Sequence, residues 1–280
     1  MRTIHVNDIT DAVAEMCIEA NIVLAQDMQD ALKKAQETEV SPLGKEILGQ
    51  LQKNMQIAKE DHIAICQDTG MTVVFASVGQ EVHIEGGALT DAINEGVRRG
   101  YRDGYLRKSV VRDPLDRVNT GDNTPAIIHY DIVPGDKLTL TIAPKGAGSE
   151  NMSKSIMLKP ADGVEGVKAA VLQAVKEAGP NACPPMVVGV GIGGNFEKSA
   201  ELAKHALTRP LTAKAQNEAM DALEAEILEM INKSGIGPAG LGGRVTALAV
   251  NIETYPTHIA QLPVAVNICC HVNRHSTRTL

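Results

Sequence analysis

The spacing of apolar residues along the chain predicts alternating helices and strands. Apolar positions recur at helical spacing over residues 7–37, and again from Ser41 to about Lys59. In the second pattern Ser41 is suited to the N-cap and Pro42 to the first helical position. Further helical patterns cover residues 89–100, 163–178, 197–208 and 214–232. Short runs rich in β-branched residues predict strands at residues 62–66, 71–78, 126–132, 137–143, 186–190, 245–252 and 262–269.

The order of these elements indicates the fold class. Helices and strands are interleaved, and the runs at 126–132 and 137–143 are separated by Pro134 and Gly135, which predicts a hairpin. No repeat of fixed period, low-complexity tract or clear linker interrupts the pattern. We therefore expect a mixed α/β fold, a layered domain of mixed β-sheets flanked by helices, that forms a single compact unit over residues 1–280.

Composition and charge narrow the class of protein. Hydrophobic residues make up 44% and charged residues 22% of the chain, as in ordinary globular proteins. With aromatic residues at 2% and a formal net charge of −7, neither nucleic acid nor an anionic membrane is an expected partner. No apolar run approaches the roughly 20 residues of a membrane-spanning helix. The N-terminal residues show no secretory signal, so a cytoplasmic location is expected.

The chain has five cysteines, an odd number that favours reduced thiols or metal ligands over disulfides. Cys17 lies on the apolar face of the first predicted helix and is expected to be a small core residue. The other four lie where strands meet loops, positions at which α/β folds gather reactive groups; they are Cys66, Cys183, Cys269 and Cys270. Their spacing matches no ferredoxin or zinc-finger pattern. The residues alone therefore indicate a cysteine site without identifying a metal.

Five segments of the chain resemble, in order, the landmarks of the class I, iron–sulfur fumarase and L-tartrate dehydratase family. They are IAICQDTGMTVVF, TIAPKGAGSENMS, NACPPMVVGVGIGGN, GIGPAGLGG and VAVNICCHVNRHS, and with the residues between them they span positions 62–276. The resemblance is to the N-terminal, or alpha, part of that family. It implies that the C-terminal part, which this chain lacks, is supplied by a separate beta subunit.

The resemblance implies a [4Fe–4S] cluster on three cysteines. Cys66 matches the ligand in the family's Cys-Gln-Asp-Thr-Gly segment, and Cys183 matches the ligand before two prolines. The third ligand falls at Cys269 or Cys270; we choose Cys270, because the family ligand directly precedes the residue that matches His271. Three thiolates leave one iron of the cluster open as a Lewis acid for a substrate carboxylate and hydroxyl.

The resemblance also implies residues that contact the substrate. Gln67 and Asp68 match a substrate-contacting pair, and Asp68 is the candidate catalytic acid or base; taken alone, these residues are typical of a turn. Arg107 matches an arginine that binds a substrate carboxylate, a task suited to the bidentate guanidinium, although a lone arginine in a polar loop is more often solvated.

Two further positions follow from the same resemblance. Gly146 lies in a glycine-rich loop whose backbone approaches the substrate in the family, and Gly148 fits nearly as well. His258 matches a histidine of the substrate pocket, although a histidine at such a position is by default structural.

The expected function is that of the alpha subunit of a hydro-lyase. It would reversibly hydrate fumarate to L-malate, act only together with its beta subunit and assemble as an α2β2-type hetero-oligomer. One alternative is an L-tartrate dehydratase alpha subunit, which would convert the small dicarboxylate L-tartrate to oxaloacetate, and another is a non-enzymatic iron–sulfur protein. A nucleotide-binding oxidoreductase would rest on the glycine run at 189–194 alone, and that run does not have the G-x-G-x-x-G spacing.

Overall fold

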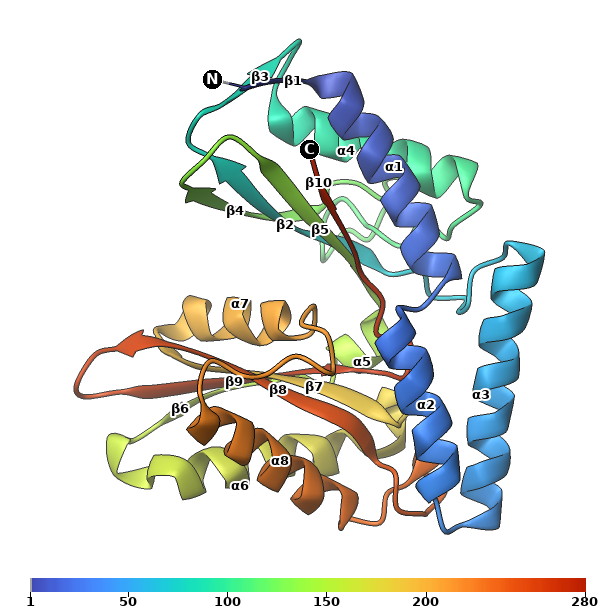
Figure 1. Cartoon of the computed structure of the whole chain (residues 1–280), viewed down its shortest axis with the longest axis vertical. Coiled ribbons are helices and arrows are strands. Elements are labelled where there is room, and N and C mark those ends of the chain that lie inside the picture. The colour runs from blue at the N-terminus through green and yellow to red at the C-terminus, as the bar shows by residue number, and fades with distance from the viewer. Residues whose placement is uncertain (1) are drawn as a thin grey trace. The chain divides into compact units, whose positions relative to one another are not determined.

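The computed structural model describes residues 2–280, and this part of the chain forms two compact units (Figure 1). Unit 1 contains residues 2–24, 55–147 and 274–280, and unit 2 contains residues 25–54 and 148–273. Each unit is assembled from segments that are separated in the sequence. Both combine sheets with helices, which confirms the expected mixed α/β class. The expectation that residues 1–280 act as one domain stays a prediction.

Unit 1 contains a four-stranded sheet and two long helices. Its strands are β1 (Arg2–His5), β2 (Met71–Gly79), β3 (Val82–Glu85), β4 (Ile127–Val133), β5 (Leu138–Lys145) and β10 (Ser276–Thr279), and its long helices are α1 (Val6–Ile22) and α4 (Leu89–Asp103). The sheet has the order β10-β5-β2-β4, with β4 parallel and β5 antiparallel to β2. β1 and β3 form a separate parallel pair. Buried side chains of α1 and α4 join those of β2 and β5 in one core.

Unit 2 contains a second four-stranded sheet between layers of helices (Figure 1). Its strands are β6 (Lys154–Leu158), β7 (Met186–Gly194), β8 (Ala247–Thr257) and β9 (Leu262–Cys269), in the order β6-β9-β7-β8. α7 (Phe196–Ala206) covers one face, and α6 (Gly163–Ala178) and α8 (Glu218–Asn232) cover the other. The unit also holds α2 (Gln26–Thr38) and the 3₁₀ turns η1 (Pro160–Asp162), η2 (Gly179–Ala182) and η3 (Pro238–Gly240). Two helices have residues in both units: α3 (Pro42–Asp61) and the short α5 (Ala147–Glu150).

The glycine run in β7 serves helix packing. A Cβ atom on Gly189 would lie 2.1 Å from the carbonyl oxygen of Ala203, and one on Gly191 would lie 2.0 Å from that of Ser199. Both carbonyls belong to α7, so the helix can lie this close to the strand only where side chains are absent. The glycines are therefore explained by the contact between β7 and α7.

Several predicted elements are confirmed, among them α6, with the predicted bounds, and the start of α3. There the Ser41 hydroxyl accepts a hydrogen bond from the Gly44 amide (3.2 Å), and Pro42 is the first helical residue. The long helix predicted at 7–37 is wrong, because α1 ends at Ile22 and α2 begins at Gln26. Val23 has extended dihedral angles, yet the apolar pattern continues because Leu24 stays buried outside the helix.

The predicted hairpin between 126–132 and 137–143 is also wrong. β4 and β5 do not pair with each other, since β2 lies between them and pairs with both. The turn at Pro134 and Gly135 instead crosses the end of β2, where the amides of Gln80 and Glu81 donate to the carbonyls of Val133 and Gly135. Residues 62–66, predicted as a strand, form an irregular segment with a turn at 62 and a bend at 65 and 66.

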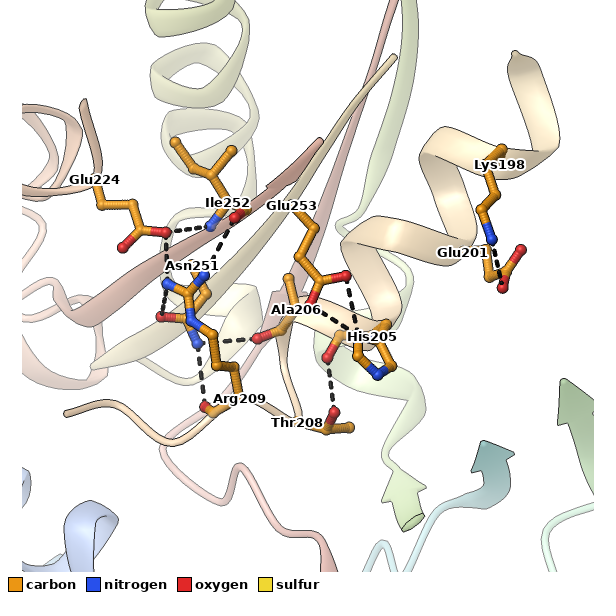
Figure 2. Close-up of polar contacts among 10 residues, drawn as sticks. All are labelled: Lys198, Glu201, His205, Ala206, Thr208, Arg209, Glu224, Asn251, Ile252 and Glu253. Atoms are coloured by element: carbon orange, nitrogen blue, oxygen red, sulfur yellow. Dashed lines mark hydrogen bonds and ion pairs between the residues drawn. The ribbon is translucent and has the colours of Figure 1, made fainter. Parts of the chain in front are cut away.

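The outer edge of β8 is capped by side chains (Figure 2). Glu224 of α8 accepts a hydrogen bond from the Ile252 amide (2.7 Å), and Arg209 donates to the Ile252 carbonyl (3.2 Å). Arg209 and Glu224 form an ion pair whose side chains are only 14% and 12% exposed. Asn251 adds hydrogen bonds to the carbonyls of Ala206 and Arg209. These side chains therefore occupy backbone groups at the edge of β8 that would otherwise be open to pairing with another strand.

We expect that replacing Glu224 with alanine destabilises the chain. The substitution leaves the Arg209 charge without its carboxylate and the Ile252 amide without its acceptor in a mostly buried place, so the free energy of unfolding should fall by about 3 kcal/mol. Urea denaturation of the two variants measures this, with Glu229→Ala as the control on the same helix. Glu229 pairs with Lys233 at the surface, so its loss should have a much smaller effect. Equal destabilisation by the two substitutions would contradict this role for Glu224.

Candidate active site

The segment from Cys66 to Gly70 is a turn that leads into β2 in unit 1, and buried side chains fix its backbone. The hydroxyl of Tyr101, a residue with no exposed surface, donates to the carbonyl oxygens of Thr69 (2.7 Å) and Gly70 (3.1 Å). The amide group of Asn123, equally buried, donates to the Gly70 carbonyl (3.1 Å). Gly70 itself has φ +80° and lies against the backbone of Lys145, where a side chain would clash. The turn is therefore held by buried hydrogen bonds from α4 and from the loop after it.

Asp68 lies in this turn with both carboxylate oxygens hydrogen-bonded. Its Oδ1 accepts from the Gly70 amide (3.0 Å), and its Oδ2 accepts from the Ala147 amide (2.8 Å). A Cβ atom on Gly146 would lie 3.1 Å from Oδ2, so the absence of a side chain there permits the close approach. The structure thus brings together Asp68 and Gly146, two of the residues that the sequence singled out.

The same turn carries Cys66 and Gln67 and is joined to Arg107. The Cys66 sulfur accepts a hydrogen bond from the Asp68 amide (3.4 Å) and donates to the Gln67 side-chain oxygen (3.4 Å). The Arg107 amide donates to the Thr69 hydroxyl (2.9 Å), while the residue as a whole is exposed. Five of the predicted site residues therefore lie in or beside one turn of unit 1.

In unit 2, a histidine side chain connects the segments that carry Cys183 and Cys270. Cys183 ends the turn η2 with left-handed backbone angles (φ 50°, ψ 62°) and is exposed. The carbonyl oxygen of Cys183 accepts a hydrogen bond from Nδ1 of His271 (3.1 Å), the residue directly after Cys270. The Cys270 sulfur in turn accepts from the Val272 amide (3.4 Å). The His271 contact therefore ties the two cysteine segments to each other.

Burial separates these cysteines from the other two. Cys269 is buried inside β9 with 4% of its surface exposed, whereas Cys270 lies past the end of the strand and is partly exposed. Cys17 is fully buried in the core of unit 1, as expected, and burial raises the pKa of the Cys17 thiol to about 12. That thiol is protonated at neutral pH and, with no exposed surface, packs as a small core residue.

His258 lies in the turn between β8 and β9, at the opposite end of β9 from Cys270. The strand of 8 residues separates them by on the order of 25 Å at about 3.3 Å per residue. Nδ1 of His258 accepts a hydrogen bond from the Ala260 amide (3.1 Å). The histidine lines an open surface hollow together with Lys198 and Tyr255. Unit 2 therefore does not bring His258 to its cysteines, and a role for it in substrate binding stays a prediction.

Neither a preassembled metal site nor a membrane-spanning helix is present in the described part of the chain. Within residues 2–280, no group of three or more His, Cys, Asp or Glu side chains is arranged to hold a metal ion. Cys66 belongs to unit 1, and Cys183 and Cys270 belong to unit 2. None of the helices in this part of the chain has the length and apolar character needed to cross a membrane.

The side chains that hold the turn were not identified from the sequence. Tyr101 and Asn123 both follow the helix predicted at 89–100, in a polar stretch with no pattern to mark them. Arg274 was within the segment VAVNICCHVNRHS but was given no role; it donates to the Asp68 carbonyl. The one signal that composition offered for Tyr101 is that tyrosine is rare in this chain, at four residues.

Comparison with known proteins identifies the family. A family model described as fumarate hydratase (Fumerase) matches residues 10–279. The chain is 41% identical over 278 residues to a putative L(+)-tartrate dehydratase subunit alpha of Methanocaldococcus jannaschii, covering 97% of both chains. It is 33% identical over 276 residues to the L(+)-tartrate dehydratase subunit alpha of Escherichia coli K12, covering 97% of this chain and 90% of that one. With a family match over nearly its whole length, the chain belongs to the fumarate hydratase (Fumerase) family, as its motifs predicted.

Proposed function

We propose that this chain is the cluster-binding alpha subunit of a hydro-lyase that acts on a small hydroxy-dicarboxylate. The observation that carries the proposal is the turn at Cys66–Gly70. There a cysteine whose sulfur accepts a backbone hydrogen bond lies two residues from an aspartate with both oxygens fixed. The family and the relatives named as alpha subunits support the hydro-lyase class and a beta subunit as partner. We further propose an α2β2-type assembly in which the chain alone is inactive.

As ligands of a [4Fe–4S] cluster we propose Cys66, Cys183 and Cys270, because thiolates are the groups that hold such clusters. Backbone amides two residues downstream donate to the sulfurs of Cys66 and Cys270, and hydrogen bonds to sulfur are a feature of iron–sulfur sites. The strained turn at Cys183 leaves that residue exposed. Cys269 and Cys17 are buried and fit the role less well. When bound, the cluster supplies an open iron that polarises the hydroxyl to be lost and binds a carboxylate.

The residues of unit 1 account for the remaining steps. Dehydration removes a proton from one carbon and hydroxide from its neighbour, so a C=C bond forms and water leaves. The Asp68 carboxylate is held in one orientation by two backbone amides and is our candidate to accept that proton. The exposed Arg107 side chain, anchored through its own backbone to the turn, is suited to a bidentate contact with a substrate carboxylate.

Two positions complete the proposed substrate contacts. The side-chain amide of Gln67 is exposed beside Cys66 and offers donors to an oxygen-rich substrate. Gly146 lets the backbone of its loop come close to the same place, since it has no side chain in the way.

For the substrate, we now favour L-tartrate over the fumarate and L-malate pair expected from the sequence. The relatives at 41% and 33% identity are named for L(+)-tartrate dehydration, whereas the matched family model is named for fumarate hydratase. Loss of water from L-tartrate gives an enol that becomes oxaloacetate. Fumarate hydration stays the second candidate because the same residues would serve both reactions.

Loss of any one proposed cluster ligand should prevent cluster binding. Serine at Cys66, Cys183 or Cys270 should abolish binding of the cluster, because each removes one thiolate that holds it. Iron and sulfide content and visible absorbance after anaerobic reconstitution measure the loss. Cys17→Ala and Cys269→Ala are the controls and should retain the full content. Loss of the cluster in Cys269→Ala but not in Cys270→Ser would show that the ligand assignment is wrong.

Relative rates on the two substrates distinguish an L-tartrate dehydratase from a fumarate hydratase. The anaerobic complex of this chain with its beta subunit should dehydrate L-tartrate with a kcat/KM at least about tenfold above that for L-malate, a difference of about 1.4 kcal/mol in the barrier. Initial rates with the two substrates measure the ratio. A preference for L-malate would restore the fumarate hydratase assignment. A complex with a full cluster and no activity on either substrate would favour a non-enzymatic iron–sulfur protein.

A further inference from the structure

Arg274 is a buried arginine whose guanidinium lies against the Asp68 turn in unit 1. It is only 5% exposed. Its Nε donates to the Pro144 carbonyl (3.1 Å), and its Nη2 donates to the Asp68 carbonyl (2.5 Å). Its Nη1 is also buried and has no hydrogen-bond partner. The guanidinium therefore contacts the turn and the end of β5 at the same time.

Among residues 2–280, no carboxylate lies within ion-pair distance of Arg274. The partly buried Arg209, by contrast, pairs with Glu224. Burying a cation without a counter-charge is costly, and two carbonyl oxygens compensate only part of that cost. A residue that is this expensive to bury is a candidate for a task other than stability.

The two carbonyls that Arg274 binds belong to the two segments that meet at the Asp68 carboxylate. One is the carbonyl of Asp68 itself, and the other precedes the loop whose Ala147 amide donates to Oδ2 of Asp68. Gly146 lies near both the guanidinium and the carboxylate. A Cβ atom on Gly146 would be 3.9 Å from Nη2 of Arg274 and 3.1 Å from Oδ2 of Asp68. One side chain thus fixes the spacing between the turn and the loop, and so the place of the carboxylate.

We propose that Arg274 is a positioning residue for Asp68, with its buried positive charge directed toward the place where the anionic substrate meets the loop at Gly146. The proposal rests on the function proposed above, because it assigns Asp68 to proton transfer. Arg274 acts through the backbone of the turn and loop and does not itself touch the substrate. The hydrogen bonds of Arg274 and its positive charge have different kinetic effects. The hydrogen bonds govern kcat, and the charge governs KM.

Two substitutions in the complete anaerobic complex test this division. Arg274→Lys keeps the charge but not the planar fork that spans both carbonyls, so kcat should fall by about a hundredfold while KM changes by less than about threefold. Arg274→Gln removes the charge as well, so KM should also rise, by about tenfold or more. The control is Arg278→Lys in β10, since Arg278 makes only partly exposed ion pairs with Glu15 and Glu19. Its kcat and KM should stay within about twofold of the parent values.

Two further measurements separate positioning from a general loss of structure. Cluster content of the Arg274 variants should equal that of the parent, and amide hydrogen exchange should quicken at residues 66–70 and 144–147 but not across the α1–α4 core. If Arg274→Lys and Arg278→Lys behave alike in kcat and exchange, the proposal is overturned. It is also overturned if kcat falls only in proportion to lost cluster or folded protein.

The role of Arg274 can be tested even if the complex has no hydro-lyase activity. A parent complex that dehydrates neither L-tartrate nor L-malate would overturn the function, not the role of Arg274. In that case hydrogen exchange at 66–70 and 144–147 still decides whether Arg274 holds the turn to the loop. Unchanged exchange in Arg274→Lys would overturn the positioning role by itself.

Discussion

The amides of Gly70 and Ala147 donate hydrogen bonds to the two oxygens of the Asp68 carboxylate, and much of unit 1 keeps these amides in place. The carbonyls on the back of the turn are bound by Tyr101, Asn123 and Arg274, all of them buried. Buried backbone groups need such partners, because water cannot reach them. The same hydrogen bonds that satisfy the backbone therefore also fix the orientation of the proposed catalytic group.

In unit 2, two cysteines lie beside the ends of strands in a tightly packed sheet. Cys183 precedes β7, and Cys270 follows β9. Gly189 and Gly191 let α7 lie directly on β7, which leaves the neighbouring strand β9 buried almost throughout. Cys269 is the last residue of that strand, and Cys270 is the first beyond it. The step of one residue from strand to loop is what distinguishes a buried thiol from an accessible one.

The sequence predicted the mixed α/β class and most helices, since apolar spacing over long segments such as 163–178 is a strong signal. It failed where pairing depends on distant segments: 126–132 and 137–143 are neighbours in sequence, yet β2 separates them. The family motifs marked Cys66, Asp68 and Gly146 as site residues, and the structure showed that Gly146 lies beside the Asp68 carboxylate. The supporting residues Tyr101 and Asn123 stayed hidden, because nothing local marks a side chain that binds a backbone carbonyl tens of residues away.

The contact between Arg274 and Asp68 joins residues 206 positions apart, and all of unit 2 lies between them in the chain, apart from its segment at residues 25–54. During synthesis, the first two segments of unit 1 leave the ribosome long before residues 274–280 do. β10 and the guanidinium can be added only after residues 274–280 have been made, so the turn around Asp68 must wait for them. A chain that stopped at residue 273 would retain all five cysteines and still lack the contact between Arg274 and Asp68.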